Sequence, residues 1–362
     1  MTPAPPSIAR RRVLHAASGI ALAMPGLLAA ACARPAAARQ ALAAPASASP
    51  ALDGAGLLVA GPVGGATDRW AERLGPALAR ALPPGHRPRR ETVGGVDGVT
   101  GANRFETHVA PDGSTALLVP GAAALAWLAG DPRARFEASH WVPALAAVAP
   151  GVIVGRLPAA KPGSGGAVRF ATTGLVGPDL PALLALDLMG VAVQPVPVPA
   201  SSPEVLSQPG VDAVFLHGPG AEDAARTLAA LGTAARGPTL LALGLPDETG
   251  RASSPPGMAD LFARVAGGSP LHAAWRAAAV AAQMEAALVL PAMAPATAVA
   301  LWRRACAQAA AGPEMQDAAA ESGVHLLPAP ACTGLIATLA VDSADLLDLR
   351  RWLAGRQGWR SS

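Results

Sequence analysis

The chain has 362 residues, of which 51% are hydrophobic, 15% are charged and 3% are aromatic. This length and composition allow a large core and indicate two domains of ordinary size. The low aromatic content, without interleaved basic residues, excludes the usual pattern of a nucleic-acid-binding protein. The formal net charge of +3 comes from Arg10, Arg11 and Arg12, the only charged residues before Cys32, so the rest of the chain is neutral overall.

The first 33 residues have the parts of a secretion signal: the three arginines, an apolar stretch over residues 16–31, and small residues around the expected cleavage point. The apolar stretch contains Pro25 and Gly26 and is shorter than the roughly 20 residues of a membrane-spanning helix. Residues 10–14 (Arg-Arg-Arg-Val-Leu) resemble the twin-arginine export motif, and an ordinary Sec signal is the alternative. We therefore expect an exported, periplasmic protein.

Cys32 follows Leu-Ala-Ala-Ala, which resembles the lipobox of bacterial lipoproteins with its leucine one place too far upstream. Two outcomes stay open: a lipid attached at Cys32, which tethers the protein to the membrane, or simple cleavage nearby, for instance after Ala33 or Ala38. Residues 34–53 are mostly alanine, serine and proline, and they predict a disordered linker.

From residue 54 onward, short apolar runs alternate with helical patterns, which indicates mostly parallel sheets covered by helices. The expected strands are residues 57–60, a segment ending at Val93, and residues 116–119, 144–154, 168–171, 191–198, 211–215 and 240–245. The expected helices are residues 66–82, 122–128, 180–189, 222–231, 270–287, 295–311 and 343–353.

Two glycine-rich turns, residues 61–68 and 94–101, follow the first two strands and precede helices. In a parallel sheet both turns lie at the carboxyl ends of their strands, so the free N–H groups of both helix starts converge on one crevice. The sequence therefore predicts a small anion pocket built from backbone amides. The alternative is a pair of tight turns without a ligand.

The Gly- and Pro-rich residues 151–166 indicate a crossing from one α/β unit to the next. We expect a return crossing near residues 286–291. Lobe 1 then comprises residues 54–150 plus 288–362, and lobe 2 comprises residues 151–287. Two lobes joined by two crossings enclose a cleft.

Cys306 and Cys332 remain after removal of the leader. In an oxidising compartment they either form a disulfide or stay as two buried free thiols. Cys306 belongs to a helical pattern, and nothing in the sequence brings the two residues together.

Five motifs occur in order between about residue 56 and about residue 345. They are residues 62–68 (Pro-Val-Gly-Gly-Ala-Thr-Asp), 95–101 (Gly-Val-Asp-Gly-Val-Thr-Gly), 111–115 (Pro-Asp-Gly-Ser-Thr), 171–174 (Ala-Thr-Thr-Gly) and 210–213 (Gly-Val-Asp-Ala). In this order the chain resembles the substrate-binding receptors of tripartite tricarboxylate transporters, the Bug-type periplasmic solute-binding proteins.

The resemblance implies a two-lobed α/β fold like that of type II periplasmic-binding proteins, each lobe a mostly parallel sheet flanked by helices, with a ligand cleft between the lobes. It implies a monomeric receptor that passes a small carboxylate to membrane permease subunits. It implies no catalysis and no cofactor, and the seven scattered histidines lack the spacing of a metal site.

The resemblance and the glycine turns together give a set of candidate ligand-binding residues: Val63, Gly64, Gly65, Thr67, Asp68, Gly95 and Gly98 in lobe 1, and Thr172, Thr173, Gly174 and Ser201 in lobe 2. Each polar member also has a structural interpretation, because Thr67 and Asp68 suit a helix start and the lobe 2 residues suit a turn or loop. Asp97 stands where the family has a small residue, and it repels a carboxylate unless it is turned outward.

The lobe 2 motif departs from the family. Where the family has Val-Pro-Tyr-Lys-Gly-Ser, residues 196–201 read Val-Pro-Val-Pro-Ala-Ser, and the chain has no tyrosine and a single lysine, Lys161. Our hypothesis is that Val198 and Pro199 make this wall more apolar and favour a smaller or less polar carboxylate. An exported sensory or scaffold protein of the same fold, with altered or lost ligand binding, is the alternative function.

Overall fold

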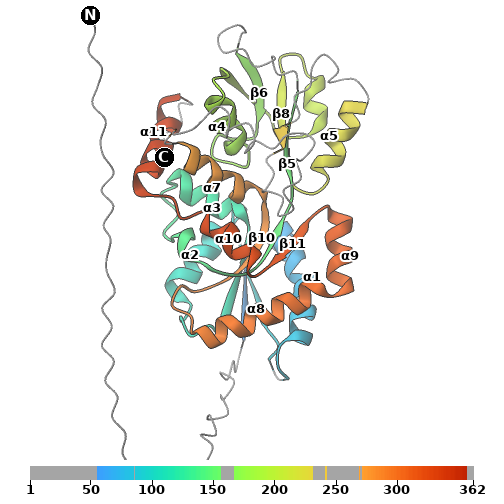
Figure 1. Ribbon diagram of the computed structural model, residues 1–362, viewed down its shortest axis with the longest axis vertical. Helices are drawn as coiled ribbons and strands as arrows, with labels where there is room; N and C mark the ends of the chain where they lie inside the picture. The colour runs from blue at the N-terminus through green and yellow to red at the C-terminus, as the bar shows by residue number, and fades with distance from the viewer. Residues whose placement is uncertain are drawn as a thin grey trace, which may run out of the picture. The chain divides into compact units, whose positions relative to one another are not determined.

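The computed structural model describes residues 55–84, 86–155, 167–230, 241–242, 269 and 271–356. The expected signal peptide, the linker and Cys32 lie outside these residues. The described chain contains two sheets with helices on their faces (Figure 1). The expected fold class, an α/β chain with two helix-flanked sheets, is confirmed.

The first sheet has the strand order β11-β4-β10-β3-β1-β2. Strand β1 pairs with β2 and β3 in parallel, while β10 is antiparallel to β3 and β4, and β11 is antiparallel to β4. The carboxyl ends of β1, β2 and β3 therefore share one edge of the sheet. The strands are β1 (Gly56–Ala60), β2 (Arg89–Val93), β3 (Thr115–Val119), β4 (Val142–Val148), β10 (Met284–Leu290) and β11 (His325–Pro328).

The second sheet has the strand order β7-β6-β8-β5-β9. Strand β6 pairs with β7 and β8 in parallel, and β5 is antiparallel to β8 and β9. The carboxyl ends of β6, β7 and β8 again share one edge. The strands are β5 (Gly151–Gly155), β6 (Val168–Thr172), β7 (Val193–Pro197), β8 (Ala213–His217) and β9 (Leu241–Ala242).

Helices connect and cover these strands. They are α1 (Ala66–Ala81), α2 (Val99–His108), α3 (Gly121–Ala129), α4 (Leu180–Leu188), α5 (Ala221–Ala230), α7 (Leu271–Gln283), α8 (Ala296–Ala311), α9 (Pro313–Ser322), α10 (Ala331–Ala337) and α11 (Ser343–Arg356), with 3-10 turns at Ala138–His140 and Pro203–Ser207. Within the described ranges, none of these helices has the length and apolar character needed to cross a membrane.

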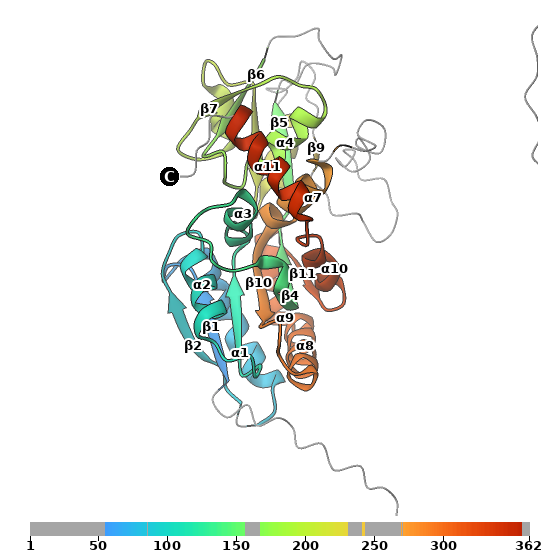
Figure 2. The ribbon, with the colours of Figure 1, turned by 90° about the vertical axis from the view of Figure 1, so that its left-hand side faces the viewer.

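Successive side chains of a strand point to opposite faces of the first sheet, and each face packs into a separate hydrophobic core. In β1, Leu57 and Val59 face α1 and α8, whereas Leu58 and Ala60 face α2 and α3. The core on the side of α2 and α3 continues into one face of the second sheet. Helix α7, which packs on both α3 and α4, connects the two parts. Helix α11 lies beside α7 and α3 (Figures 1 and 2). The two sheets thus share buried helices.

Two details differ from the sequence expectation. Both sheets combine parallel and antiparallel pairs, because strands β10 and β11 in the first sheet and β5 in the second run opposite to the βαβ strands, and an apolar run does not reveal its direction. The single strand expected over residues 144–154 is two strands, β4 and β5, in different sheets, and the helix expected to reach residue 287 ends at Gln283 and gives way to β10. Alanine-rich apolar segments suit either helix or strand, so periodicity alone did not place these boundaries.

The two cysteines of the described chain, Cys306 and Cys332, are buried free thiols. Burial raises the pKa of Cys332 to about 11 and also raises that of Cys306, where the nearby Cys332 adds to the shift. The free-thiol alternative is therefore the one present in this structure.

Candidate functional site

The turn after β1 is held in place by Asp68, in the first turn of α1. The Asp68 side chain is 1% exposed, and its Oδ2 accepts a hydrogen bond from the Gly64 amide at 2.8 Å. Its Oδ1 accepts a second from the Thr92 hydroxyl at 2.9 Å, and the Arg90 guanidinium lies 3.8 Å away. The Gly64 amide is the main cause of a lowered pKa of Asp68, with Thr92 and Arg90 adding to it. The turn is thus fixed to α1 and to β2.

This arrangement divides the backbone donors of the turn into used and free groups. The amide of Gly64 binds Asp68, and that of Gly65 binds the Pro62 carbonyl at 2.9 Å. The amides of Ala66 and Thr67, in the first turn of α1, have no acceptor among the described residues. Gly64 has φ of 75°, a left-handed conformation that glycine adopts without strain.

The other predicted residues of this turn have different positions. Val63 is 81% exposed, while the Thr67 side chain is 5% exposed and packs toward Gly61. Among the predicted residues of the turn, the free donors are therefore backbone N–H groups at the start of α1. Arg69, which was not predicted, adds an exposed guanidinium that donates to the Gly64 carbonyl at 2.7 Å.

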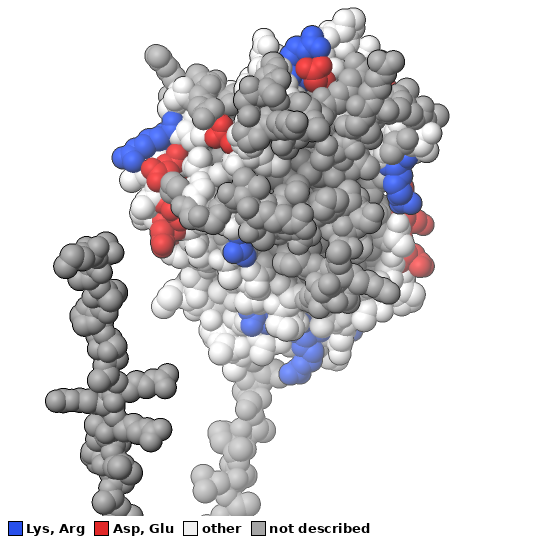
Figure 3. All heavy atoms as spheres, turned by 45° about the horizontal axis from the view of Figure 1, so that its top comes forward, with Lys and Arg blue, Asp and Glu red and all other residues white. Residues whose placement is uncertain are grey.

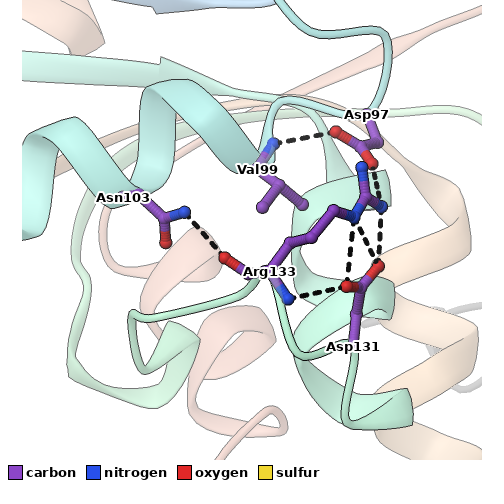
Figure 4. Close-up of polar contacts among 5 residues, drawn as sticks. All are labelled: Asp97, Val99, Asn103, Asp131 and Arg133. Carbon is purple, nitrogen blue, oxygen red and sulfur yellow. Dashed lines mark hydrogen bonds and ion pairs between the residues drawn. The ribbon is translucent and has the colours of Figure 1, made fainter. Parts of the chain in front are cut away.

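The turn after β2 is held by Asp97 (Figure 4). Its Oδ1 accepts a hydrogen bond from the Val99 amide at 3.1 Å, and its Oδ2 accepts one from Arg133 at 2.7 Å. Arg133 also pairs with Asp131 at 2.6 Å, and its carbonyl accepts a bond from Asn103 at 2.7 Å. The two carboxylates raise the pKa of Arg133, and Arg133 lowers that of Asp131.

Asp97 is therefore turned toward Arg133, which compensates its charge. The Asp97 carboxylate also accepts a hydrogen bond from the amide of Val99, the first residue of α2. Position 98 requires glycine, because its φ is 76° and a Cβ there would lie 2.6 Å from Pro120 Cδ. Gly95 accepts a bond from the Gly98 amide at 3.3 Å through its carbonyl. These contacts explain both glycines as parts of a packed turn, and their ligand-binding role stays a prediction.

In the second sheet, one buried carboxylate gathers the predicted polar residues. Asp179 is 0% exposed, and its Oδ2 accepts hydrogen bonds from the Thr173 amide at 2.8 Å and the Thr173 hydroxyl at 3.1 Å. The Thr172 hydroxyl lies 3.0 Å from the same oxygen, and the Ser201 hydroxyl lies 3.3 Å from Oδ1. The Gly174 amide in turn donates to the Thr172 hydroxyl at 3.1 Å.

The start of α4 offers no free amide to a ligand. The amide of Leu180 donates to the Gly177 carbonyl at 3.1 Å, and that of Ala182 donates to the Asp179 carbonyl at 3.1 Å. Pro181, between them, has no N–H group. The structure therefore brings Thr172, Thr173, Gly174 and Ser201 together, but around a carboxylate of the protein itself.

The side chain of Val198 does not line this wall. It is 8% exposed and packs in the core between the second sheet and α5, with Val205 and Val211. Pro199 is exposed. The hypothesis of an apolar wall formed by Val198 is therefore not supported by its position.

Three titratable residues near these turns were missed from the sequence: Asp179, His217 and Glu285. His217 ends β8 and stacks on Phe215 with ring centroids 5.7 Å apart. Burial lowers the pKa of His217, and the charge of Asp179 opposes that shift. Two signals were available: Asp179 precedes Leu-Pro at a helix start, and Glu285 is the single charged residue of the apolar run 284–290.

Among the described residues on the face in Figure 3, basic and acidic side chains gather in small separate groups. A hollow of about 550 Å³ lies elsewhere, between α5 and the β11–α9 region. None of the predicted site residues lines it.

Comparison with known proteins supports the fold. A crystal structure of a TctC solute-binding protein from Polaromonas, without ligand, is similar over 81% of this chain and 95% of its own, with a TM-score of 0.55 and 16% sequence identity. The malate-bound MatC from Rhodopseudomonas palustris covers 82% of this chain and 97% of its own at 16% identity, with a TM-score of 0.46. No protein-family model and no curated protein matches the sequence. At this identity the first similarity shows a shared fold, as the resemblance read from the sequence implied.

Proposed function

We propose that this protein is an extracytoplasmic solute-binding receptor of the Bug type, which captures a small carboxylate and delivers it to a tripartite tricarboxylate-type permease. The fold shared with a TctC solute-binding protein supports this proposal, and so do the five ordered sequence motifs. The same proposal includes export through the signal in residues 1–33, by the twin-arginine or the Sec route, with lipid attachment at Cys32 or simple cleavage. The receptor acts as a monomer without catalysis.

The observation that carries the proposal is the start of α1. A helix N-terminus with unpaired amides attracts a carboxylate through hydrogen bonds and the helix dipole. The amides of Ala66 and Thr67 meet this condition, and Asp68 fixes the preceding turn so that no reorganisation is needed on binding. A hydrogen bond between an amide and a charged acceptor contributes about 1.5–3 kcal/mol.

A second candidate function has one observation in its favour. The hydroxyl and amide donors expected to meet a ligand in the second sheet are bound to Asp179. An exported sensory or scaffold protein that has lost its ligand would show such internally satisfied donors. The two functions differ in whether any small carboxylate stabilises the protein.

The test is thermal unfolding of the purified protein with a panel of mono- and dicarboxylates. A ligand at 100 times its Kd adds about 2.7 kcal/mol to the free energy of unfolding. The informative variant is Ala66→Pro, which removes one free N–H group at the first position of α1, where proline is well tolerated. Gly65 has ψ of 175°, an extended conformation that suits a residue before proline.

We expect Ala66→Pro to keep the melting temperature of the free protein and to weaken carboxylate binding roughly 10- to 100-fold. The matched control is Ala296→Pro, at the exposed first position of α8, which should bind as the unmodified protein does. Equal loss in both variants would assign the effect to stability. Absence of any stabilising carboxylate would favour the sensory or scaffold function.

A further inference from the structure

The chain crosses between the two sheets at two places that lie side by side. Strand β4 leads into β5 at residues 148–151, and α7 leads into β10 at residues 283–284. The Ala149 amide donates a hydrogen bond to the Gln283 carbonyl at 2.8 Å, so the two crossings are bonded to each other. We call the first sheet with its helices the first half, and the second sheet with α4 and α5 the second half. Two adjacent crossings form a pivot, and further contacts decide how far one half can rotate against the other.

Helix α11, near the end of the described chain, supplies such contacts. It packs on α3 and α7 (Figure 2). Leu349 and Leu353 are fully buried in the core that the two sheets share, and Trp352 is 7% exposed. Arg350 and Trp352 are two positions apart, so their side chains leave the helix about 200° apart around its axis. Each of these two side chains bonds to a different half.

The Arg350 side chain binds the end of α3, which follows β3 in the first half. Its Nη2 donates to the Trp127 carbonyl at 3.2 Å, and its Nε donates to the Leu128 carbonyl at 3.4 Å. The last carbonyls of a helix have no partner within the helix, and the helix dipole favours a cation beside them. Gly130 leaves room for the guanidinium, because a Cβ there would lie 2.6 Å from Arg350 Nε. Arg350 thus fastens α11 to the first half.

The Trp352 side chain binds the end of α4, which follows β6 in the second half. Its Nε1 donates to Asp187 Oδ2 at 2.9 Å. Asp187 lies in the last turn of α4, where the helix dipole disfavours a negative charge. The stability of α4 therefore does not explain a carboxylate at this position, whereas the contact with α11 does.

We propose that α11 is a strap that limits rotation of the two halves about the pivot, with Trp352 and Asp187 forming its anchor in the second half. Both anchors belong to one helix, so a rotation that moves the end of α4 away from the end of α3 has to break one of them. The bond from Trp352 to a carboxylate is charge-assisted and belongs to the stronger class of hydrogen bonds. This inference goes beyond the proposed receptor function and does not depend on it.

The test measures distances between the halves by pulsed electron paramagnetic resonance. Spin labels are attached at Arg73→Cys on α1 and Thr227→Cys on α5, two exposed positions, one in each half. Cys306 and Cys332 are buried, so a Cys32→Ser background leaves the introduced thiols for the label. Trp352→Phe keeps an aromatic ring in the core and removes the N–H donor. We expect it to add a second distance component, whose population rises about tenfold because one charge-assisted hydrogen bond is lost.

The matched control is Trp302→Phe. Trp302 Nε1 donates to the Gly113 carbonyl at 2.9 Å and its side chain is fully buried, but both residues belong to the first half. This variant loses a similar indole hydrogen bond and should keep the distance distribution of the unmodified protein. Asp187→Asn, which keeps an acceptor and removes its charge, should give a second component of intermediate population.

Unchanged distance distributions in both Trp352→Phe and Asp187→Asn would overturn the proposal, because the halves would then be held by packing without the strap. Equal broadening in Trp302→Phe would overturn it as well, since the loosening would not depend on α11. Circular dichroism checks that each variant is folded, and Asp187→Asn decides the question if Trp352→Phe does not fold. The measurement uses no solute, so its outcome leaves the receptor function untouched.

Discussion

The starts of α1 and α4 each contain a buried aspartate, but only the start of α1 has free backbone amides. Asp68 lies inside α1 and accepts the amide of Gly64, which precedes the helix, so the amides of Ala66 and Thr67 stay free. Asp179 directly precedes α4, and its carboxylate accepts hydrogen bonds from the amide and hydroxyl of Thr173. Asp68 is the third residue of α1 and Asp179 is the residue before α4, and neither carboxylate accepts an amide of its own helix. In the first turn of α4 itself, each amide instead donates to a backbone carbonyl or, at Pro181, does not exist.

This comparison also separates the two sheets by their free donors. The first sheet has free backbone donors at the start of α1 beside carboxylates that are already bonded, whereas the polar donors of the second sheet are bound to Asp179. The predictions below test Asp179, Asp68 and, in the turn after β2, Asp97, beginning with the largest expected effect.

Substitution of Asp179 should be the most destabilising change. Asp179→Ala leaves the amide of Thr173 and the hydroxyls of Thr172 and Ser201 without their acceptor, and we expect the free energy of unfolding to fall by about 2–4 kcal/mol. Urea unfolding measures this change. Asp317→Ala, at an exposed position of α9, should change it by less than about 0.5 kcal/mol. A loss below about 1 kcal/mol for Asp179→Ala would contradict the central role given to this carboxylate.

Substitution of Asp68 should have a smaller effect that depends on pH. Asp68→Asn keeps the shape but weakens the bonds to Gly64 and Thr92, at a cost of about 1–2 kcal/mol at pH 7. Because the folded protein holds the pKa of Asp68 below its ordinary value of 3.8, the stabilisation by the charged form is complete above that value. It is lost as the pH falls through the lowered pKa.

The measurement is the free energy of unfolding of both proteins between pH 7 and pH 2.5. The difference between them should stay constant down to about pH 5 and shrink below pH 3.8. A difference that grows at low pH would show that Asp68 is not held in its charged form.

Substitution of Asp97 should have the smallest effect. The Arg133–Asp97 pair is largely exposed at its arginine, with 62% of that side chain accessible, so we expect Asp97→Ala to cost less than about 1 kcal/mol. Arg133 keeps its bonds to Asp131 in this variant. Carboxylate affinity should rise by less than about threefold at low salt and return to that of the unmodified protein at 0.5 M salt. A large loss of affinity would instead make Asp97 a ligand-binding residue.

The sequence predicted much of the fold because its signals there are local. Trp70, Leu74 and Leu78 recur at helical spacing in α1, and the glycine turns mark the ends of β1 and β2. A return crossing was expected near residues 286–291, but strand β10 was not predicted there. Alanine-rich segments carry little preference between helix and strand, and the pairing of β10 with β3 and β4 is a long-range contact.

The site was harder to predict than the fold. Thr172, Thr173 and Ser201 lie around Asp179, and their ligand-binding role stays a prediction. Motif spacing does not show which acceptor a hydroxyl faces. Asp179 takes those donors across 7 and 22 residues of sequence. Glu285 lies beside Gly218 but belongs to a strand far along the chain, so this proximity exists only in the folded protein.

The most direct test of the account follows the backbone amides themselves. In a two-dimensional NMR titration of the labelled protein with the tightest carboxylate found by calorimetry, the amides of Ala66 and Thr67 should shift downfield with the binding curve. The amides of Leu180 and Ala182 at the start of α4, which already have acceptors, should move little. Saturating shifts at α4 with none at α1 would contradict the assignment of the carboxylate site to the start of α1.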